Sequence, residues 1–204
     1  QIFVMKIDGS DQRQITSGAA SSSGPVWSPN GKKIAFVTGG QIWTMENDGD
    51  DTKQVTRIST GAGNPVWSPN GRWIAFASEV FPECDSDACN RSEDEKIESS
   101  KVKAKVAERL LFKHWNEWRD RKRSHVFVIP SEGGIARDLT PGDFDSPPYG
   151  ASTGVDFAFS PDSSEIAFLR NPDKIEAVST NSDIYVMPLA AGAAARNITV
   201  ANRG

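Results

Sequence analysis

Two short segments of the chain carry side chains that could do chemistry. Residues 150–154 read Gly-Ala-Ser-Thr-Gly and match the G-x-S-x-G pattern around a nucleophilic serine. That pattern requires a strand before the serine and a helix after it, but prolines precede Ser152 and a predicted strand at 155–159 follows it. Both histidines also lie upstream, against the order Ser, Asp, His. We therefore assign Ser152 to a loop and expect no catalytic residue in this chain.

The second segment reads His-Trp-Asn-Glu-Trp-Arg and begins at His114. An imidazole close to a carboxylate could hold or gate a charged ligand, so His114, Trp115, Glu117 and Trp118 are candidate site residues. Two other interpretations stay open. The tryptophans could only pin this segment to the body of the protein, and His114 could be an ordinary surface or core residue.

Cys84 and Cys89 are the two cysteines of the chain, and they lie in a polar segment. A disulfide between them is geometrically accessible and would favour an exported protein. The alternatives are two free thiols or a pair of soft metal ligands. A structural zinc site needs a second Cys/His pair, which the sequence lacks. We predict no metal site and no cofactor.

These segments are positioned by a repeat with a period of about forty residues, at 25–36 and 65–76, with a looser copy at 157–168. In each copy an aromatic residue ends a short strand, and Ser-Pro breaks the strand because proline has no N–H to donate. Asn-Gly at 30–31 and 70–71 is expected to supply the positive φ angles of a two-residue turn. Ile-Ala-Phe then begins a second, buried strand. Each copy is therefore a predicted β-hairpin.

Two further predicted strands recur with the hairpin. The first of them lies at 2–5, 42–45, 126–129 and 184–187, and the second ends in threonine at 14–16, 54–56, 138–140 and 197–199. Four short antiparallel strands are the pattern of a β-propeller blade, so the predicted fold is all-β. The chain, 1–204, divides into a half-blade at 1–16 and blades at 25–56, 64–140 and 155–200. Propellers close with four to eight blades, and we therefore expect this partial propeller to be a fragment of a larger one.

Residues 79–124 form an insertion that interrupts the blade at 64–140. Its first part, 79–100, has eight acidic and two basic residues, a net charge of −6, and is predicted to be a loop. Its second part, 101–123, has nine basic and three acidic residues, a net charge of +6, and is predicted to contain a helix over about 100–120, capped by Ser99 or Ser100. The apolar positions of that helix are Val102, Val106, Leu110, Leu111, Trp115 and Trp118. We expect it to stand at the rim of the propeller where a substrate would enter.

The overall composition is that of an ordinary globular domain, 37% hydrophobic with a net charge of −4. No apolar run is long enough to span a membrane. The basic run 119–123 could suggest nucleic acid, but the chain is net acidic and no aromatic platform accompanies the run. We expect no nucleic-acid partner, and interpret the run as a solvated helix end or as a charge partner for the acidic segment.

The repeated Trp-Ser-Pro-Asn-Gly-x-x-Ile-Ala-Phe, followed by Ile-x-x-Met and Gln-Ile/Val-Thr, resembles the TolB-like propeller repeat. That repeat occurs in periplasmic scaffold proteins and in peptidases of the prolyl-oligopeptidase family. The insertion, with Glu-Val-Phe-Pro from Glu79, the two cysteines and the segment 110–118, resembles that of dipeptidyl-peptidase-V-type and acylaminoacyl-peptidase-type enzymes. So does the later segment 137–148.

This resemblance implies the non-catalytic propeller portion of a secreted or periplasmic serine exopeptidase, which gates and shapes a peptide-binding cleft. The serine, aspartate and histidine of such enzymes belong to a C-terminal α/β-hydrolase domain, so this chain alone is not expected to be an enzyme. In related dipeptidyl peptidases, acidic residues of a helical insertion hold the amino terminus of the substrate, which makes Glu108 and Glu117 candidates. The hydrolase domain or a second subunit of a homodimer would cover the apolar face of the helix. The alternative is a TolB-like protein-interaction propeller without enzymatic activity.

Overall fold

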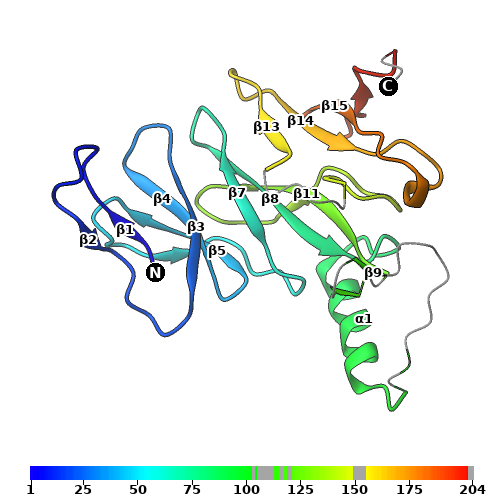
Figure 1. Cartoon of the computed structure of the whole chain (residues 1–204), viewed down its shortest axis with the longest axis horizontal. Coiled ribbons are helices and arrows are strands. Elements are labelled where there is room, and N and C mark those ends of the chain that lie inside the picture. Colours follow the sequence, from blue (N-terminus) through cyan, green and yellow to red (C-terminus); the bar gives the residue numbers. More distant parts are fainter. Residues whose placement is uncertain (103, 105–112, 115–116, 119–120, 149–154, 202–204) are drawn as a thin grey trace.

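The computed structural model describes residues 1–102, 104, 113–114, 117–118, 121–148 and 155–201. Its strands form three four-stranded antiparallel sheets and two two-stranded ones, and the larger sheets follow one another in chain order (Figure 1). The predicted fold class, a partial set of four-stranded blades with one helical insertion, is confirmed.

The bounds of the elements are as follows. The two-stranded sheet nearest the N-terminus pairs β1 (Phe3–Val4) with β2 (Arg13–Gln14). The first blade contains β3 (Ser22–Trp27), β4 (Lys33–Thr38), β5 (Gln41–Glu46) and β6 (Lys53–Gln54). The second contains β7 (Gly63–Trp67), β8 (Trp73–Val80), β11 (Arg123–Pro130) and β12 (Arg137–Asp138). The third contains β13 (Phe157–Phe159), β14 (Glu165–Arg170), β15 (Asp183–Pro188) and β16 (Arg196–Asn197), with the short 3₁₀ helix η1 (Glu176–Val178) between β14 and β15.

The Ser-Pro-Asn-Gly sequence makes its turn through side-chain hydrogen bonds. The Ser28 hydroxyl donates to Asn30 Oδ1 at 2.9 Å and accepts from the backbone N–H of Lys33 at 2.8 Å. The N–H of Gly31 donates to the carbonyl of Ser28, which places Pro29 at the second position of a β-turn, where its fixed φ is favoured. Gly31 has a positive φ of 68°, whereas Asn30 is not among the positive-φ residues. The expectation that both residues adopt positive φ was therefore wrong: asparagine is used for its side-chain oxygen.

The threonine that follows each outermost strand has a structural role. The Thr56 hydroxyl accepts a hydrogen bond from the N–H of Ile42 at 2.8 Å, which ties the end of the blade to the start of its third strand. The same bond joins Thr140 to Val126 at 2.9 Å. It also occurs in the other two repeats, from Ile2 to Thr16 and from Ile184 to Thr199.

The hydrophobic core lies between consecutive sheets. Along β4, Ile34 and Phe36 pack against the preceding two-stranded sheet, while Ala35 joins the cluster shared with the second blade. This follows from the alternation of side chains on a strand. The Ile-Ala-Phe of β8 repeats the arrangement one blade later. The repeat therefore encodes the packing of one blade on the next. The loops at the ends of the strands do not contribute to this packing pattern and can vary.

The insertion differs from its predicted structure. The helix, α1 (Asp87–Ser99), lies in the acidic part that was predicted to be a loop. In the basic part, where a helix was expected over 100–120, the described residues include two short paired strands, β9 (Lys113–His114) and β10 (Glu117–Trp118). Ser86 caps the start of α1, and Ser100 lies at its end instead of capping a second helix. The predicted boundary between loop and helix was wrong because α1 has almost no apolar face to reveal its period.

Candidate functional site at the insertion face

The connectivity of the blades decides where the insertion emerges. Consecutive antiparallel strands alternate in direction, so the Ser-Pro-Asn-Gly turns all lie at the same end of the strands. The link from β8 to β11 and the links between blades lie at the opposite end of the strands. We call the surface at this opposite end the insertion face. It comprises α1, the adjoining ends of β8, β11 and β14, and the links 57–62 and 141–148.

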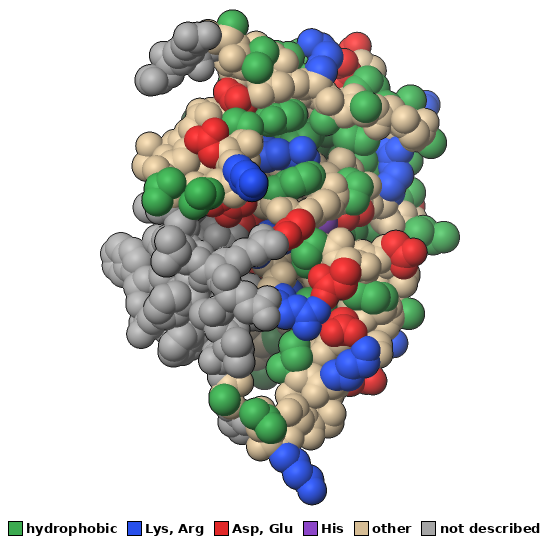
Figure 2. Space-filling model, turned by 90° about the vertical axis from the view of Figure 1, so that its right-hand side faces the viewer, with side chains coloured by type: hydrophobic (Ala, Val, Ile, Leu, Met, Phe, Trp, Pro, Cys, Tyr) green, Lys and Arg blue, Asp and Glu red, His purple; other side chains and the backbone are tan. Residues whose placement is uncertain are grey.

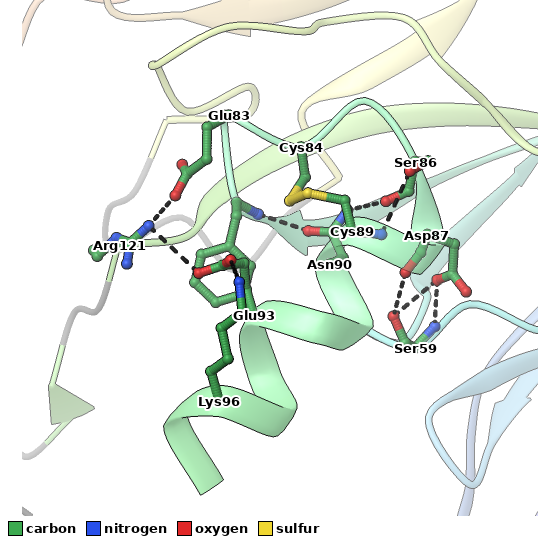
Figure 3. Close-up of a disulfide and its surroundings, with 11 residues drawn as sticks. Ser59, Glu83, Cys84, Ser86, Asp87, Cys89, Asn90, Glu93, Lys96 and Arg121 are labelled. Carbon is green, nitrogen blue, oxygen red and sulfur yellow. Dashed lines mark hydrogen bonds and ion pairs between the residues drawn. A yellow bond between two sulfur atoms is a disulfide. The ribbon is translucent and has the colours of Figure 1, made fainter. Parts of the chain in front are cut away.

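A disulfide and a buried asparagine fix α1 to the end of β8 (Figure 3). Cys84 and Cys89 are disulfide-bonded, with their Cα atoms 5.4 Å apart. Asn90 is 5% exposed, and its Oδ1 accepts from the N–H of Phe81 at 2.8 Å. Its Nδ2 donates to the carbonyl of Ser86 at 3.1 Å. The first turn of the helix is therefore bonded to the strand from which the insertion leaves.

The helix is also bonded to the preceding link between blades. Asp87 Oδ1 accepts hydrogen bonds from the N–H and the hydroxyl of Ser59, at 2.7 Å and 2.8 Å (Figure 3). The other carboxylate oxygen of Asp87 pairs with Arg91, four residues further along the helix, at 2.9 Å. An acidic residue in the first turn is favourable because the N-terminus of a helix carries partial positive charge. One carboxylate thus joins the helix to a neighbouring segment of the insertion face.

The basic end of the insertion pairs with its acidic beginning. Arg121 forms ion pairs with Glu83 and Glu93, and Lys122 Nζ lies 2.7 Å from Asp94. The hydrogen bond from Lys96 lowers the pKa of Glu93, and the charge of Arg121 acts in the same direction. Of the two interpretations of the basic run, a charge partner for the acidic segment is confirmed for these residues. Basic and acidic side chains accordingly alternate over the lower part of the molecule in Figure 2, where α1 lies.

Three candidate site residues, His114, Glu117 and Trp118, lie on the short paired strands β9 and β10. The register pairs His114 directly with Glu117, so the backbone brings these two candidates side by side. Trp118 lies on the same hairpin, opposite Lys113. Trp115 and Glu108 lie outside the described residues, as does the segment that contains Ser152. Their roles therefore stay predictions.

A second cluster on this face was missed by the sequence reasoning. His125, 1% exposed, contacts Asp138 Oδ2 through Nδ1 at 2.7 Å and the carbonyl of Gly142 through Nε2 at 2.9 Å. Arg123 lies two residues earlier on β11 and pairs with Asp143 at 3.0 Å. The link 141–148 is thereby bonded to the blade that precedes it. No short sequence pattern predicts this cluster, because its members come from a strand end, an outer strand and a loop that are separated along the chain.

The described residues offer neither a metal site nor a membrane-spanning helix. Within them, no group of three or more His, Cys, Asp or Glu side chains could hold a metal ion. No helix in that part of the chain has the length and apolar character needed to cross a membrane.

The chain is similar in sequence to curated proteins and in fold to solved structures. No family model matches it. Over 200 residues, 94% of the chain, it is 34% identical to the protein named Dipeptidyl-peptidase 5 of Porphyromonas gingivalis, and the match spans 28% of that protein. The solved acylaminoacyl peptidase of Pyrococcus horikoshii matches 96% of the chain with a TM-score of 0.62 at 17% identity, over 27% of its own length. A putative TolB of Agrobacterium tumefaciens matches 96% of the chain with a TM-score of 0.53 at 18% identity, over 52% of its length.

These matches confirm the resemblance inferred from the repeat. At such identities the two solved structures establish the fold, which is that of a TolB-like propeller. The match to Dipeptidyl-peptidase 5 is a relationship of sequence, and the chain spans little more than a quarter of that relative.

Proposed function

From its relationship to the Dipeptidyl-peptidase 5 proteins, we propose that this chain is the propeller portion of a serine exopeptidase of the dipeptidyl- or acylaminoacyl-peptidase type. In this proposal it carries no catalytic residue. A C-terminal α/β-hydrolase domain of the same polypeptide supplies the chemistry, and the insertion face gates and shapes the cleft through which peptides reach it. Export to the periplasm or the medium fits the Cys84–Cys89 disulfide, since disulfides persist in oxidising compartments.

The observation that carries the proposal is the extent of the sequence match. It spans 94% of the chain, which leaves about twelve of the 204 residues outside it. The insertion at 79–124 has 46 residues, so most of it must lie within the match. The matched range therefore runs through the feature that departs from the common repeat.

The construction of the insertion face supports a gating role. A structure that shapes the entrance to a cleft needs a defined conformation. The helix α1 has one, because it is held by a disulfide, by the buried Asn90 and by the bonds of Asp87 to Ser59. The hairpin that pairs His114 with Glu117 belongs to the same insertion. A carboxylate there would hold the free ammonium group of a peptide by a charge-assisted hydrogen bond.

The test uses the complete polypeptide and two sets of dipeptidyl substrates, one with a free amino terminus and one acetylated. We expect Glu117→Gln to raise KM for the free-amino set by roughly 10- to 150-fold, because a hydrogen bond to a charged group contributes roughly 1.5–3 kcal/mol. KM for the acetylated set should stay unchanged. Glu95→Gln is the matched control, because Glu95 is an exposed carboxylate on α1. Equal effects on the two substrate sets would refute the role of Glu117.

A protein-interaction propeller of the TolB kind is the second candidate, and the structural match to the Agrobacterium protein favours it. It predicts that the complete polypeptide hydrolyses no peptide. Hydrolysis by the complete polypeptide, abolished by a serine-directed inhibitor, would refute this candidate.

A further inference from the structure

Arg170 occupies an unusual position at the insertion face, at the end of β14. Its guanidinium carbon lies 3.5 Å from the centroid of the Phe144 ring, 4.9 Å from that of Tyr185 and 5.3 Å from that of Phe168. Nε donates to the Ser146 hydroxyl at 3.0 Å. Three aromatic rings and one hydroxyl thus hold the cation in a fixed orientation between the second and third blades.

Among the described residues, no carboxylate forms a direct ion pair with Arg170. Asp183, its partner in the strand register, is bonded instead to Asn197 at 2.7 Å and to Thr199 at 2.7 Å. Asp138, whose charge opposes the lowering of the Arg170 pKa, is bonded to His125. Within the part of the chain that the structure describes, Nε makes the one hydrogen bond of the guanidinium, so Nη1 and Nη2 have no acceptor.

Partial burial makes this arrangement costly. Desolvation lowers the pKa of Arg170, because the aromatic rings replace water around the charged group. A guanidinium presents a planar fork of N–H groups that matches a carboxylate in bidentate geometry. A carboxylate that approached Nη1 and Nη2 of Arg170 would compensate for the hydration that the guanidinium has lost. The stacked rings would already have fixed the plane of the guanidinium.

The support behind Arg170 is rigid. Phe144 and Ser146 belong to the link 141–148, which is bonded to the preceding blade through His125, through Arg123 with Asp143, and through the N–H of Ser146, which donates to the carbonyl of Ser124 at 2.6 Å. An arginine oriented by such a support loses little freedom on binding, which favours affinity.

We propose that Arg170 binds the carboxylate of a peptide ligand at the insertion face. This deepens the proposed function and rests on it for the identity of the ligand as a peptide. The carboxylate can belong to a chain terminus or to an acidic side chain, since both present the same pair of oxygens. Arg170 therefore selects peptides by negative charge, at a place distinct from the hairpin that carries Glu117.

The test measures binding to the complete polypeptide, with any peptidase activity blocked by a serine-directed inhibitor, by calorimetry with three tetrapeptides. They are Ala-Ala-Ala-Ala with a free carboxylate, the same peptide as its amide, and Ala-Ala-Glu-Ala as its amide. We expect the free acid to bind at least about tenfold more tightly than its amide, as a charge-assisted pair requires. The glutamate peptide distinguishes the two sources, because it restores affinity only if a side-chain carboxylate reaches the site.

Variants connect this preference to the residue. Arg170→Gln should abolish the difference between acid and amide, and Arg170→Lys should retain part of it, since lysine keeps the charge and loses the fork. Arg13→Gln is the matched control, because Arg13 donates to a backbone carbonyl, that of Asn47, on an exposed strand. If Arg170→Gln does not fold, Arg170→Lys carries the test, and an undiminished preference in it would overturn the proposal.

Two results would overturn the proposal directly: equal binding of acid and amide to the unaltered chain, or a preference that survives Arg170→Gln. Either would identify Arg170 as a purely structural stack. These results are separable from a failure of the proposed function. A complete polypeptide without peptidase activity would refute the peptidase assignment and leave the carboxylate preference of the chain measurable.

Discussion

The link between α1 and the blade can be tested at Asn90. This side chain is 5% exposed, and it satisfies the backbone N–H of Phe81, a residue with no exposed surface. Asn90→Ala removes the acceptor and leaves that N–H buried without a partner, which costs roughly 1–3 kcal/mol. The lost bond to the carbonyl of Ser86 adds about 1 kcal/mol. The expected destabilisation is therefore roughly 2–4 kcal/mol.

The assay is amide hydrogen exchange at Phe81, together with thermal unfolding. A change of 2–4 kcal/mol, at about 1.4 kcal/mol per factor of ten, should accelerate exchange of the Phe81 amide by roughly 30- to 700-fold. If the insertion unfolds together with the blades, Tm should fall by roughly 4–16 °C, since 1 kcal/mol shifts Tm by about 2–4 °C at this chain length. A faster Phe81 amide without a change in Tm would show that α1 opens alone.

The matched control is Asn47→Ala. Asn47 is exposed, and its side chain donates one longer hydrogen bond, 3.2 Å, to the carbonyl of Gly31. Its removal should cost at most about 0.5 kcal/mol. Unchanged exchange at Phe81 in Asn90→Ala would refute the reasoning, because it would mean that the asparagine does not hold the insertion to β8.

Two further predictions concern the disulfide and a hairpin turn. Reduction should raise the intact mass by about two daltons, and neither Cys84 nor Cys89 should react with an alkylating agent under native conditions; two reactive thiols would contradict the bond. In the turn of the third blade, hydrogen bonds from Ser160 and then Ser164 lower the pKa of Asp162 to about 2 from 3.8. A lowered pKa means that the turn is stabilised above about pH 4 and loses this contribution as the pH falls towards 2, so the Ser164 amide should lose exchange protection over that interval and not near neutrality.

The hairpins illustrate what can be inferred from neighbouring residues. In all three copies a serine hydroxyl bonds both to the Asn or Asp two residues on and to an N–H five residues on. All of these partners lie within six positions of one another, so the fold of each turn is written in a short stretch of sequence. For the same reason, the repeat predicted antiparallel sheets of four strands each.

The structure of the insertion could not be predicted from neighbouring residues. α1 is stabilised by Asp87 with Ser59, by Arg121 with Glu93, and by the disulfide, and the first two of these join segments 28 residues apart. Its sequence is almost wholly polar, so no apolar period marks it as a helix. The basic part has an apolar period that predicted a helix, yet it contributes the paired strands β9 and β10.

Two kinds of interaction shape this chain: short-range contacts within the repeat, and contacts between segments far apart in the sequence. The sequence by itself determined the blades, because their turns, their alternating strands and the threonine bonds depend on contacts that recur at fixed spacings. Only the tertiary structure decided the position of the helix, the burial of Asn90 and the stacking of Arg170 on three aromatic rings. The physical reason is that charge pairs, buried amides and stacked rings on the insertion face join residues whose separation in sequence follows no period.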